Sequence, residues 1–117
     1  MIVLVTGGRT YANYIRVWQV LDDVLAYCLA NRIELAVLQG GATGADEHAR
    51  DWCENRFLCC FSCHAWWTRG KSAGPIRNGW MAHHLPIDYV LAFPGGSGTE
   101  SMKKIARAKG IKVAEYA

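Results

Sequence analysis

The chain of 117 residues has no apolar run long enough to cross a membrane and no block of basic residues. Its apolar stretches fall short of the roughly 18 residues that a span requires, and the N-terminal run 2–5 lacks the basic flank and the length of a signal-peptide core. The net charge is only +3, with Lys and Arg scattered along the sequence, which is no nucleic-acid footprint by itself. We therefore expect a cytoplasmic protein without a membrane partner.

An even set of cysteines, as a disulfide framework requires, is also missing. Five cysteines without an export signal are expected to be reduced thiols. The segment Cys60 to His64 spells the C-x-x-C-H pattern of haem attachment, and Cys60 and Cys63 could bind zinc together with His64, His83 or His84. The same segment has the pattern of a buried strand, in which cysteine packs well. We therefore predict no metal and no cofactor.

The hydrophobic content of 51% is sufficient for the core of one domain over residues 1–117. Short β-branched apolar runs predict strands at 2–6, 35–39, 58–65, 89–93 and 111–115. Helices are predicted over 13–31, from 44 with Thr43 and Asp46 as a capping box, from Pro75, and from 98 or 99 to about 110. This alternation predicts an α/β fold, a Rossmann-like three-layer αβα sandwich with a mostly parallel five-stranded sheet.

Glycine-rich segments follow three of the predicted strands, at 6–9, 39–46 and 93–100. Such a strand-to-helix turn lets backbone N–H groups approach an anion at the positive end of the helix dipole. Parallel strands end at the same edge, so these loops are expected to line one crevice where the strand order switches direction. A nucleotide is the most natural ligand for such a crevice.

The two common nucleotide-binding fingerprints are absent. The first turn does not match G-x-G-x-x-G, which argues against an ordinary dinucleotide-binding domain. Residues 69–72 end like a P-loop, but Ala65 replaces its first glycine, which argues against an NTPase.

The motifs at 5–9, 40–46, 74–81 and 93–99 together resemble the SLOG superfamily, and within it the small YspA or cpYpsA-related family. This resemblance implies a sensor or binding module for a nucleotide or nucleotide-derived ligand. The superfamily also contains the lonely guy phosphoribohydrolases, which cleave the base from a cytokinin nucleoside monophosphate, and proteins that handle single-stranded DNA. Phosphoribohydrolase activity and single-stranded nucleic-acid binding are thus the two alternatives.

The hydrolases carry an arginine and a glutamate at positions that hold Arg77 and Met102 here. A thioether cannot stabilise the oxocarbenium character that develops at the ribose, so the resemblance favours binding over catalysis. On this reasoning Met102→Glu is the one substitution that could restore some activity, although a single group rarely rebuilds a site. Hydrolysis without that change requires Asp46 or Glu100 to reach the ribose.

The resemblance and the loops together define a set of candidate ligand-binding residues. The set consists of Gly7, Gly8, Arg9, Gly40, Gly41, Asp46, Arg77, Asn78, Pro94, Gly95, Gly96, Ser97, Gly98 and Thr99. Arg77 is predicted to contact phosphate and Arg9 to face the ligand. Asp46 is predicted to contact ribose hydroxyls because a carboxylate repels phosphate. In the alternative interpretation these residues have structural roles only. The glycines then serve turn geometry, the two arginines form surface ion pairs, and Asp46 interacts favourably with the dipole of the helix that it begins.

Five tryptophans are many for this length. Trp66 and Trp67 follow the third predicted strand, where a ring could stack on a nucleobase or cover an interface between subunits. Trp18, Trp52 and Trp80 lie in predicted helices and are expected in the core or an interface. We therefore expect a homo-oligomer, most simply a dimer.

Overall fold

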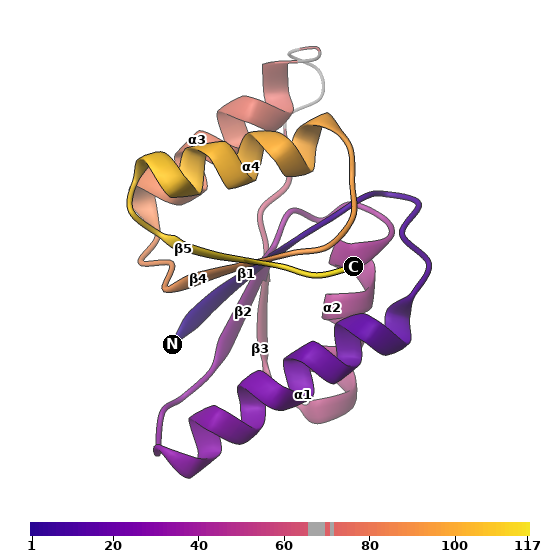
Figure 1. Ribbon diagram of the computed structural model, residues 1–117, viewed down its shortest axis with the longest axis vertical. Coiled ribbons are helices and arrows are strands. Elements are labelled where there is room, and N and C mark those ends of the chain that lie inside the picture. Colours follow the sequence, from indigo (N-terminus) through magenta and orange to yellow (C-terminus); the bar gives the residue numbers. More distant parts are fainter. Residues whose placement is uncertain (66–69, 71) are drawn as a thin grey trace.

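The computed structural model describes residues 1–65, 70 and 72–117. Strands and helices alternate along this part of the chain (Figure 1). In order they are β1 Ile2–Thr6, α1 Tyr14–Ala30, β2 Ala36–Gln39, α2 Ala45–Arg56, β3 Cys59–Ser62, α3 Ala73–His84, β4 Tyr89–Ala92, α4 Ser97–Ala108 and β5 Lys112–Glu115.

The strands form one sheet in the order β3-β2-β1-β4-β5, and every neighbouring pair is parallel. Helices α1 and α2 cover one face of the sheet, and α3 and α4 cover the other (Figure 1). This arrangement confirms the predicted Rossmann-like αβα sandwich. Since the chain moves outward from β1 through β2 to β3 and then returns to place β4 beside β1, the strand order switches direction between β1 and β4.

The central strands are buried on both faces, which explains why they appear in the sequence as nearly continuous apolar runs. In β1, Val3 and Val5 belong to the core beneath α1 and α2, whereas Leu4 belongs to the core beneath α3 and α4. The same alternation places Val37 in the first core and Leu38 in the second. The sheet therefore separates two hydrophobic cores.

Helix α1 lies on the sheet through an apolar stripe with helical spacing. Its buried side chains are Val17, Val20, Leu21 and Cys28. Asn13 caps its first turn, because its Oδ1 accepts from the N–H of Arg16 at 3.2 Å. The prediction for this helix is confirmed to within one residue at each end.

The prediction of a buried third strand is wrong. β3 is shorter than expected and forms an edge of the sheet, with Cys59 exposed and Phe61 59% exposed. Cys60 packs against the first core and Cys63 against the second. The expected alternation of faces thus holds, but nothing in the local pattern distinguishes an apolar edge strand from a central one.

The predicted capping box at the start of α2 is also wrong. Gly44 is the N-cap and receives no side-chain cap. The hydroxyl of Thr43 instead donates to the carbonyl of Arg9 at 2.9 Å, and Asp46 accepts from the loop that precedes it. The two side chains therefore join loops together rather than closing the helix end.

Helices α3 and α4 begin slightly earlier than predicted, with Pro75 inside the first turn of α3. Trp52 is fully buried, Trp18 is partly buried against the first core, and Trp80 is 50% exposed. The expectations for Trp66, Trp67, Arg69 and Lys71 lie outside the described residues.

Candidate functional site

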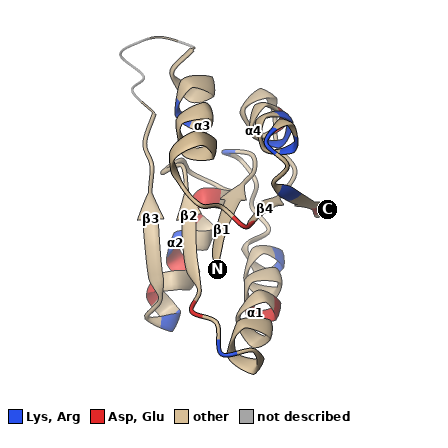
Figure 2. Cartoon of the chain, turned by 90° about the vertical axis from the view of Figure 1, so that its left-hand side faces the viewer, with Lys and Arg blue, Asp and Glu red and all other residues tan. Residues whose placement is uncertain are grey.

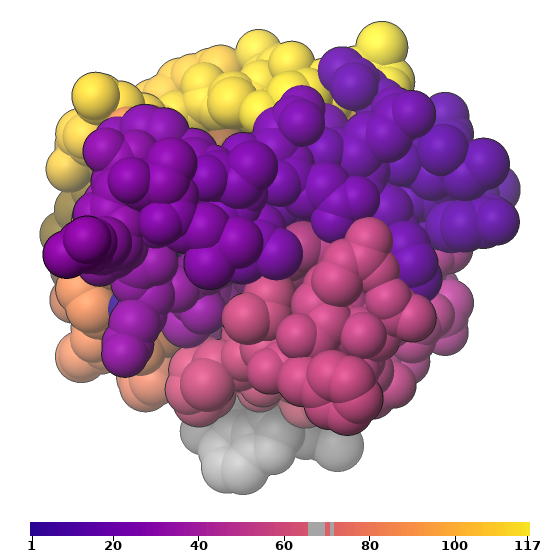
Figure 3. Space-filling view, turned by 90° about the horizontal axis from the view of Figure 1, so that it is seen from below, coloured from indigo at the N-terminus to yellow at the C-terminus, as the bar shows by residue number. Residues whose placement is uncertain are grey.

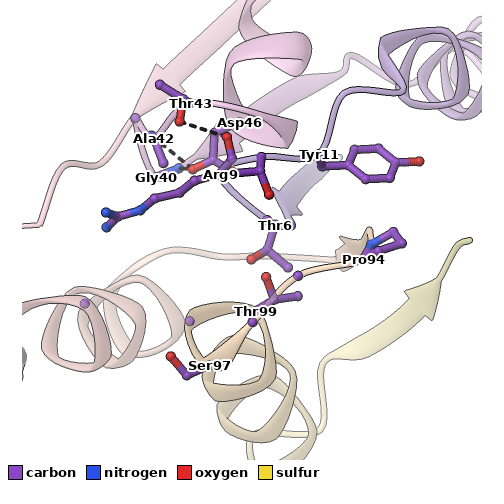
Figure 4. Close-up of a pocket in the computed structure, with 18 of the residues that line it drawn as sticks. Thr6, Arg9, Tyr11, Gly40, Ala42, Thr43, Asp46, Pro94, Ser97 and Thr99 are labelled. Atoms are coloured by element: carbon purple, nitrogen blue, oxygen red, sulfur yellow. Dashed lines mark hydrogen bonds between the residues drawn. The ribbon is translucent and has the colours of Figure 1, made fainter.

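A pocket of about 1230 Å³ lies at the carboxyl edge of the sheet, above the switch between β1 and β4. It is lined by the loops that follow β1, β2 and β4 and by the first turns of α3 and α4. In Figure 4, Arg9, Thr43 and Asp46 lie on one side of this pocket, and Ser97 and Thr99 lie on the other. Thirteen of the fourteen candidate residues line it, the exception being Asn78.

The loops after β1 and β4 approach each other so closely that only glycine fits between them. The N–H of Gly8 donates to the carbonyl of Pro94 at 2.8 Å. A Cβ on Gly95 would overlap Thr99 Oγ1 and lie 2.6 Å from the Gly8 nitrogen, and one on Gly7 would lie 2.6 Å from Ala45 Cβ. For Gly7 and Gly95, the structure thus provides a packing reason for the glycine.

Gly96 and Gly98 have no such packing reason. A Cβ on either would meet no atom within 4 Å among the described residues, and both line the pocket. No side chain caps the N-terminus of α4, where the first backbone N–H groups have no acceptor within the helix. This helix end therefore offers donors and open space to a ligand.

Asp46 is a buried carboxylate, 6% exposed, at the start of α2. Its Oδ2 accepts from the N–H of Gly40 at 3.1 Å and of Ala42 at 3.2 Å (Figure 4). Burial raises the pKa of Asp46, although these hydrogen bonds and the charge of Arg77 act in the opposite direction. Asp46 thus fixes the loop after β2 and is more easily protonated than an exposed aspartate.

Arg77 is half-buried and reaches from α3 into the ends of β2 and β3. Its Nη1 donates to the carbonyls of Gly40 at 2.8 Å and Cys63 at 3.1 Å. Nη2 makes no hydrogen bond within the described part of the chain. Burial lowers the pKa of Arg77, while the nearby Asp46 charge raises it. Arg77 therefore supports the pocket wall as well as adding positive charge to it.

Asn78 does not line the pocket but holds residues that do. It is 3% exposed, its Oδ1 accepts from Arg77 Nε at 2.9 Å, and its Nδ2 donates to the carbonyl of Gly98 at 3.3 Å. Asn78 thus connects α3 to the first turn of α4 and orients the guanidinium. Direct contact of Asn78 with a ligand stays a prediction, and its buried position gives it a structural role at the pocket wall.

Several lining residues were not among the candidates. They include Thr6, Tyr11, Asn13, Thr43 and His64. The ring of His64 stands against Gly41, whose φ of +75° and lack of a side chain make room for it. His64 lies two residues after β3, at the carboxyl edge, but the predicted strand 58–65 included this residue, so the sequence pattern did not identify it as a lining residue. Tyr11 packs on Phe93 at 5.6 Å between ring centroids, a contact that no local pattern predicts.

Met102 does not line the pocket. It is 1% exposed and packs in the second core with Leu4, Met81 and Val90. Among the lining residues described, Asp46 is the one carboxylate, and Glu100 instead pairs with Lys103 at 2.6 Å. The expectation that a glutamate at position 102 restores activity loses its structural basis, because that side chain would enter the core.

Two further findings concern the described residues as a whole. None of their His, Cys, Asp and Glu side chains gather in groups of three that could hold a metal ion. Within the same residues, no helix combines the length and the apolar character needed to cross a membrane.

The parallel sheet and the glycine-lined pocket at its switch point define a doubly wound α/β protein. The sequence model of the YspA, cpYpsA-related SLOG family matches residues 1–70. The Gene 61 protein of Mycobacterium phage D29 is 34% identical over 122 residues, which cover 97% of this chain and 94% of the phage protein. No solved structure matches the chain. The chain belongs to the YspA, cpYpsA-related SLOG family.

Proposed function

We propose that this protein binds a nucleotide or a nucleotide-derived ligand in the switch-point pocket, with a phosphate group at the N-terminus of α4. The observation that carries this proposal is the open N-terminus of α4, where no side chain caps the helix and Gly96 and Gly98 leave space within the pocket. Backbone N–H groups and the helix dipole both favour an anion at such a position.

The opposite wall of the pocket supplies groups suited to the rest of a nucleotide. Arg9 and Arg77 add positive charge, and Asp46 offers carboxylate oxygens to ribose hydroxyls. The volume of about 1230 Å³ slightly exceeds the usual range for sites that enclose small organic ligands. Membership of the SLOG family favours the same class of ligand.

Binding without hydrolysis is the activity that the lining residues favour. Cleavage of the N-glycosidic bond needs a carboxylate placed to stabilise the oxocarbenium ion, and Met102, at the position of the hydrolase glutamate, lies in the second core rather than in the pocket. We therefore propose a binding or sensing module. An assay for release of free base from nucleoside monophosphates tests the absence of hydrolysis. Rapid release by the unmodified protein that is lost in Asp46→Asn would contradict the proposal of binding without hydrolysis.

Charge pairing argues against a single-stranded nucleic-acid binder. Basic positions occur on several elements, with a group on α4 (Figure 2). On α4, Lys103 lies 2.5 Å and Arg107 lies 3.1 Å from the carboxylate of Glu115. These cations are already partly neutralised. Nucleic-acid binding would instead appear as an affinity that falls steeply with salt.

A thermal-shift screen over mono-, di- and cyclic nucleotides tests the proposal. At a hundredfold excess over Kd, a ligand that binds only the folded state adds about 2.7 kcal/mol to the free energy of unfolding. For a domain of this size, the melting temperature should rise by about 8–15 °C. If no nucleotide at millimolar concentration raises the melting temperature, the proposal fails.

Gly96→Val provides the site-specific variant, because its side chain would occupy the space proposed for the phosphate. Gly79→Val is the matched control, since a Cβ at Gly79 also meets no atom within 4 Å and this residue does not line the pocket. We expect Gly96→Val to abolish the ligand-induced shift and Gly79→Val to retain it. Equal shifts in the two variants would show that the loop is only a turn.

A further inference from the structure

A second cavity lies beside α1, on the side of this helix that faces β5. Its volume is about 410 Å³, and its walls are formed by α1, β1, β4 and the C-terminal segment around β5. Aliphatic side chains from all four of these elements line it, together with Tyr27, Tyr89, Tyr116, Arg16 and Asp23. We refer to this cavity as the α1–β5 groove. Apolar surface with aromatic rings and a few charged groups is suited to a protein partner.

In the described part of the chain, no helix packs along β5 on this face of the sheet. Helix α2 lies on the other side of α1, where Trp52 Nε1 donates to Asp22 Oδ1 at 2.9 Å. Helices α3 and α4 cover the opposite face. Figure 3 shows the result at the molecular surface, with α1 between the C-terminal segment on one side and the α2–β3 segment on the other. The groove is therefore open at the surface of a single chain.

Two opposite charges lie on the groove side of α1. Arg16 and Asp23 both line the groove, and they are seven residues apart, which is two helical turns or about 10 Å. The guanidinium carbon of Arg16 lies 5.4 Å from the centre of the Tyr116 ring, and Asp23 is exposed. Neither side chain forms an ion pair with another described residue. Both charges are therefore available to a partner.

This pattern of charge is complementary to itself. In an interface with two-fold symmetry, a residue that faces a second residue of the partner is matched by the same contact in reverse. If two copies of α1 lie antiparallel with the axis beside Gln19 and Val20, Arg16 of each copy faces Asp23 of the other. Helices packed about 8–10 Å apart bring such side chains within reach. One arrangement thus forms two ion pairs.

We propose that a second copy of this chain covers the α1–β5 groove, in a symmetric dimer with antiparallel α1 helices. The pairing of Arg16 with Asp23 also places Tyr27, which is 55% exposed and lies one turn beyond Asp23. Tyr27 of each copy faces the N-terminal end of α1 in the other copy, beside Tyr116 in the groove. Burial of the Tyr27 ring supplies affinity, and the ion pairs fix the orientation.

The α1–β5 groove is separate from the switch-point pocket. The two cavities share no lining residue among those described. The dimer therefore leaves the pocket open, and the proposal does not depend on any nucleotide.

Sedimentation equilibrium of the full chain tests the proposal. We expect a reversible dimer with twice the 13.0 kDa mass of one chain. Asp23→Arg places like charges opposite each other at both ends of the interface and should raise the Kd of the dimer by about tenfold or more. Asp51→Arg, at an exposed position of α2 outside the groove, changes the net charge equally and should leave the Kd unchanged.

Two further variants separate the ion pairs from the apolar contact. Arg16→Asp combined with Asp23→Arg exchanges the two charges, so the Kd should return toward that of the unmodified protein. Tyr27→Ala removes the exposed ring without changing the charge and should also weaken the dimer. Far-UV circular dichroism verifies that every variant folds.

Three results would overturn the proposal. The first is a chain that stays monomeric at millimolar concentration, which would leave the groove to a small apolar ligand or to another protein. The second is a dimer that Asp23→Arg and Asp51→Arg weaken equally. The third is a folded double variant that remains as weak a dimer as Asp23→Arg alone, because the two charges would then not face each other.

Discussion

Gly95 and Gly96 are neighbours in the chain and have opposite surroundings. A Cβ on Gly95 would collide with backbone of the β1 loop, whereas one on Gly96, which lines the pocket, would meet no atom within 4 Å. The first glycine is therefore required by the fold. The second is the position where a side chain would compete with a ligand.

The first prediction concerns this pair. Gly95→Ala should lower the free energy of unfolding by about 1–3 kcal/mol, because the new methyl group overpacks the contact between the loops after β1 and β4. Gly96→Ala should change it by less than about 1 kcal/mol while weakening nucleotide binding. Urea titrations measure both values. A greater loss of stability in Gly96→Ala than in Gly95→Ala would mean that Gly96, and not Gly95, is the glycine that the fold requires.

The second prediction follows from the buried carboxylate of Asp46. Its pKa is raised above 3.8 in the folded protein, so the stability that it contributes is fully present below pH 3.8 and is lost as the pH rises through the folded pKa. Asp46→Asn lacks this titration. The free energy of unfolding of Asp46→Asn, relative to the unmodified protein, should therefore increase from acidic to neutral pH.

Urea titrations at several pH values measure this difference, because the contributions of the other carboxylates cancel between the two proteins. A difference that stays constant with pH would mean that the pKa of Asp46 is the same in the folded and unfolded states.

At the scale of elements, successive parts of α4 contact the pocket, the second core and β5. Its first turn faces the pocket, Met102 and Ala106 pack in the second core, and Lys103 and Arg107 pair with Glu115 of β5. The helix thus fixes its open N-terminus relative to the sheet through contacts further along its length. This rigidity favours a preformed site.

The third prediction tests the position of Met102 within α4. Met102→Glu should lower the free energy of unfolding by about 3 kcal/mol or more, because it places a carboxyl group in an apolar core. Met102→Leu, which nearly conserves volume, should cost less than about 1.5 kcal/mol. Chemical denaturation measures both. A stable Met102→Glu protein that releases free base from a nucleoside monophosphate would refute this assignment and support the hydrolase alternative.

At the scale of the whole molecule, one sheet supports two cores on opposite faces. Leu21 of α1 is fully buried in the first core, and Leu4 of β1 is 1% exposed in the second. Since β1 contributes side chains to both cores, loss of one should disturb the other. The chain is therefore expected to unfold as a single domain.

The fourth prediction tests this coupling. Leu21→Ala and Leu4→Ala should each lower the free energy of unfolding by about 2–5 kcal/mol and shift the whole transition. In both variants, tryptophan fluorescence and far-UV circular dichroism should report one coincident transition. Two separate transitions would mean that the two layers unfold independently.

The sequence by itself determined the alternation of strands and helices, the parallel sheet and the loops expected at one edge. These features depend on local periodicity and on the geometry that parallel strands impose. The short apolar runs and the glycine turns therefore predicted β1, β2, β4 and the position of the pocket. The family motifs at the same turns indicated the family.

Only the tertiary structure decided what each side chain contacts. The local pattern could not show that β3 is an edge strand, that Met102 lies in the core, or that Asp46 accepts from Gly40 and Ala42. Burial and hydrogen bonding depend on the segments that pack on a residue, and those segments are distant in sequence. For the same reason, the packed Gly95 and the open Gly96 look alike in the sequence and differ only in the folded chain.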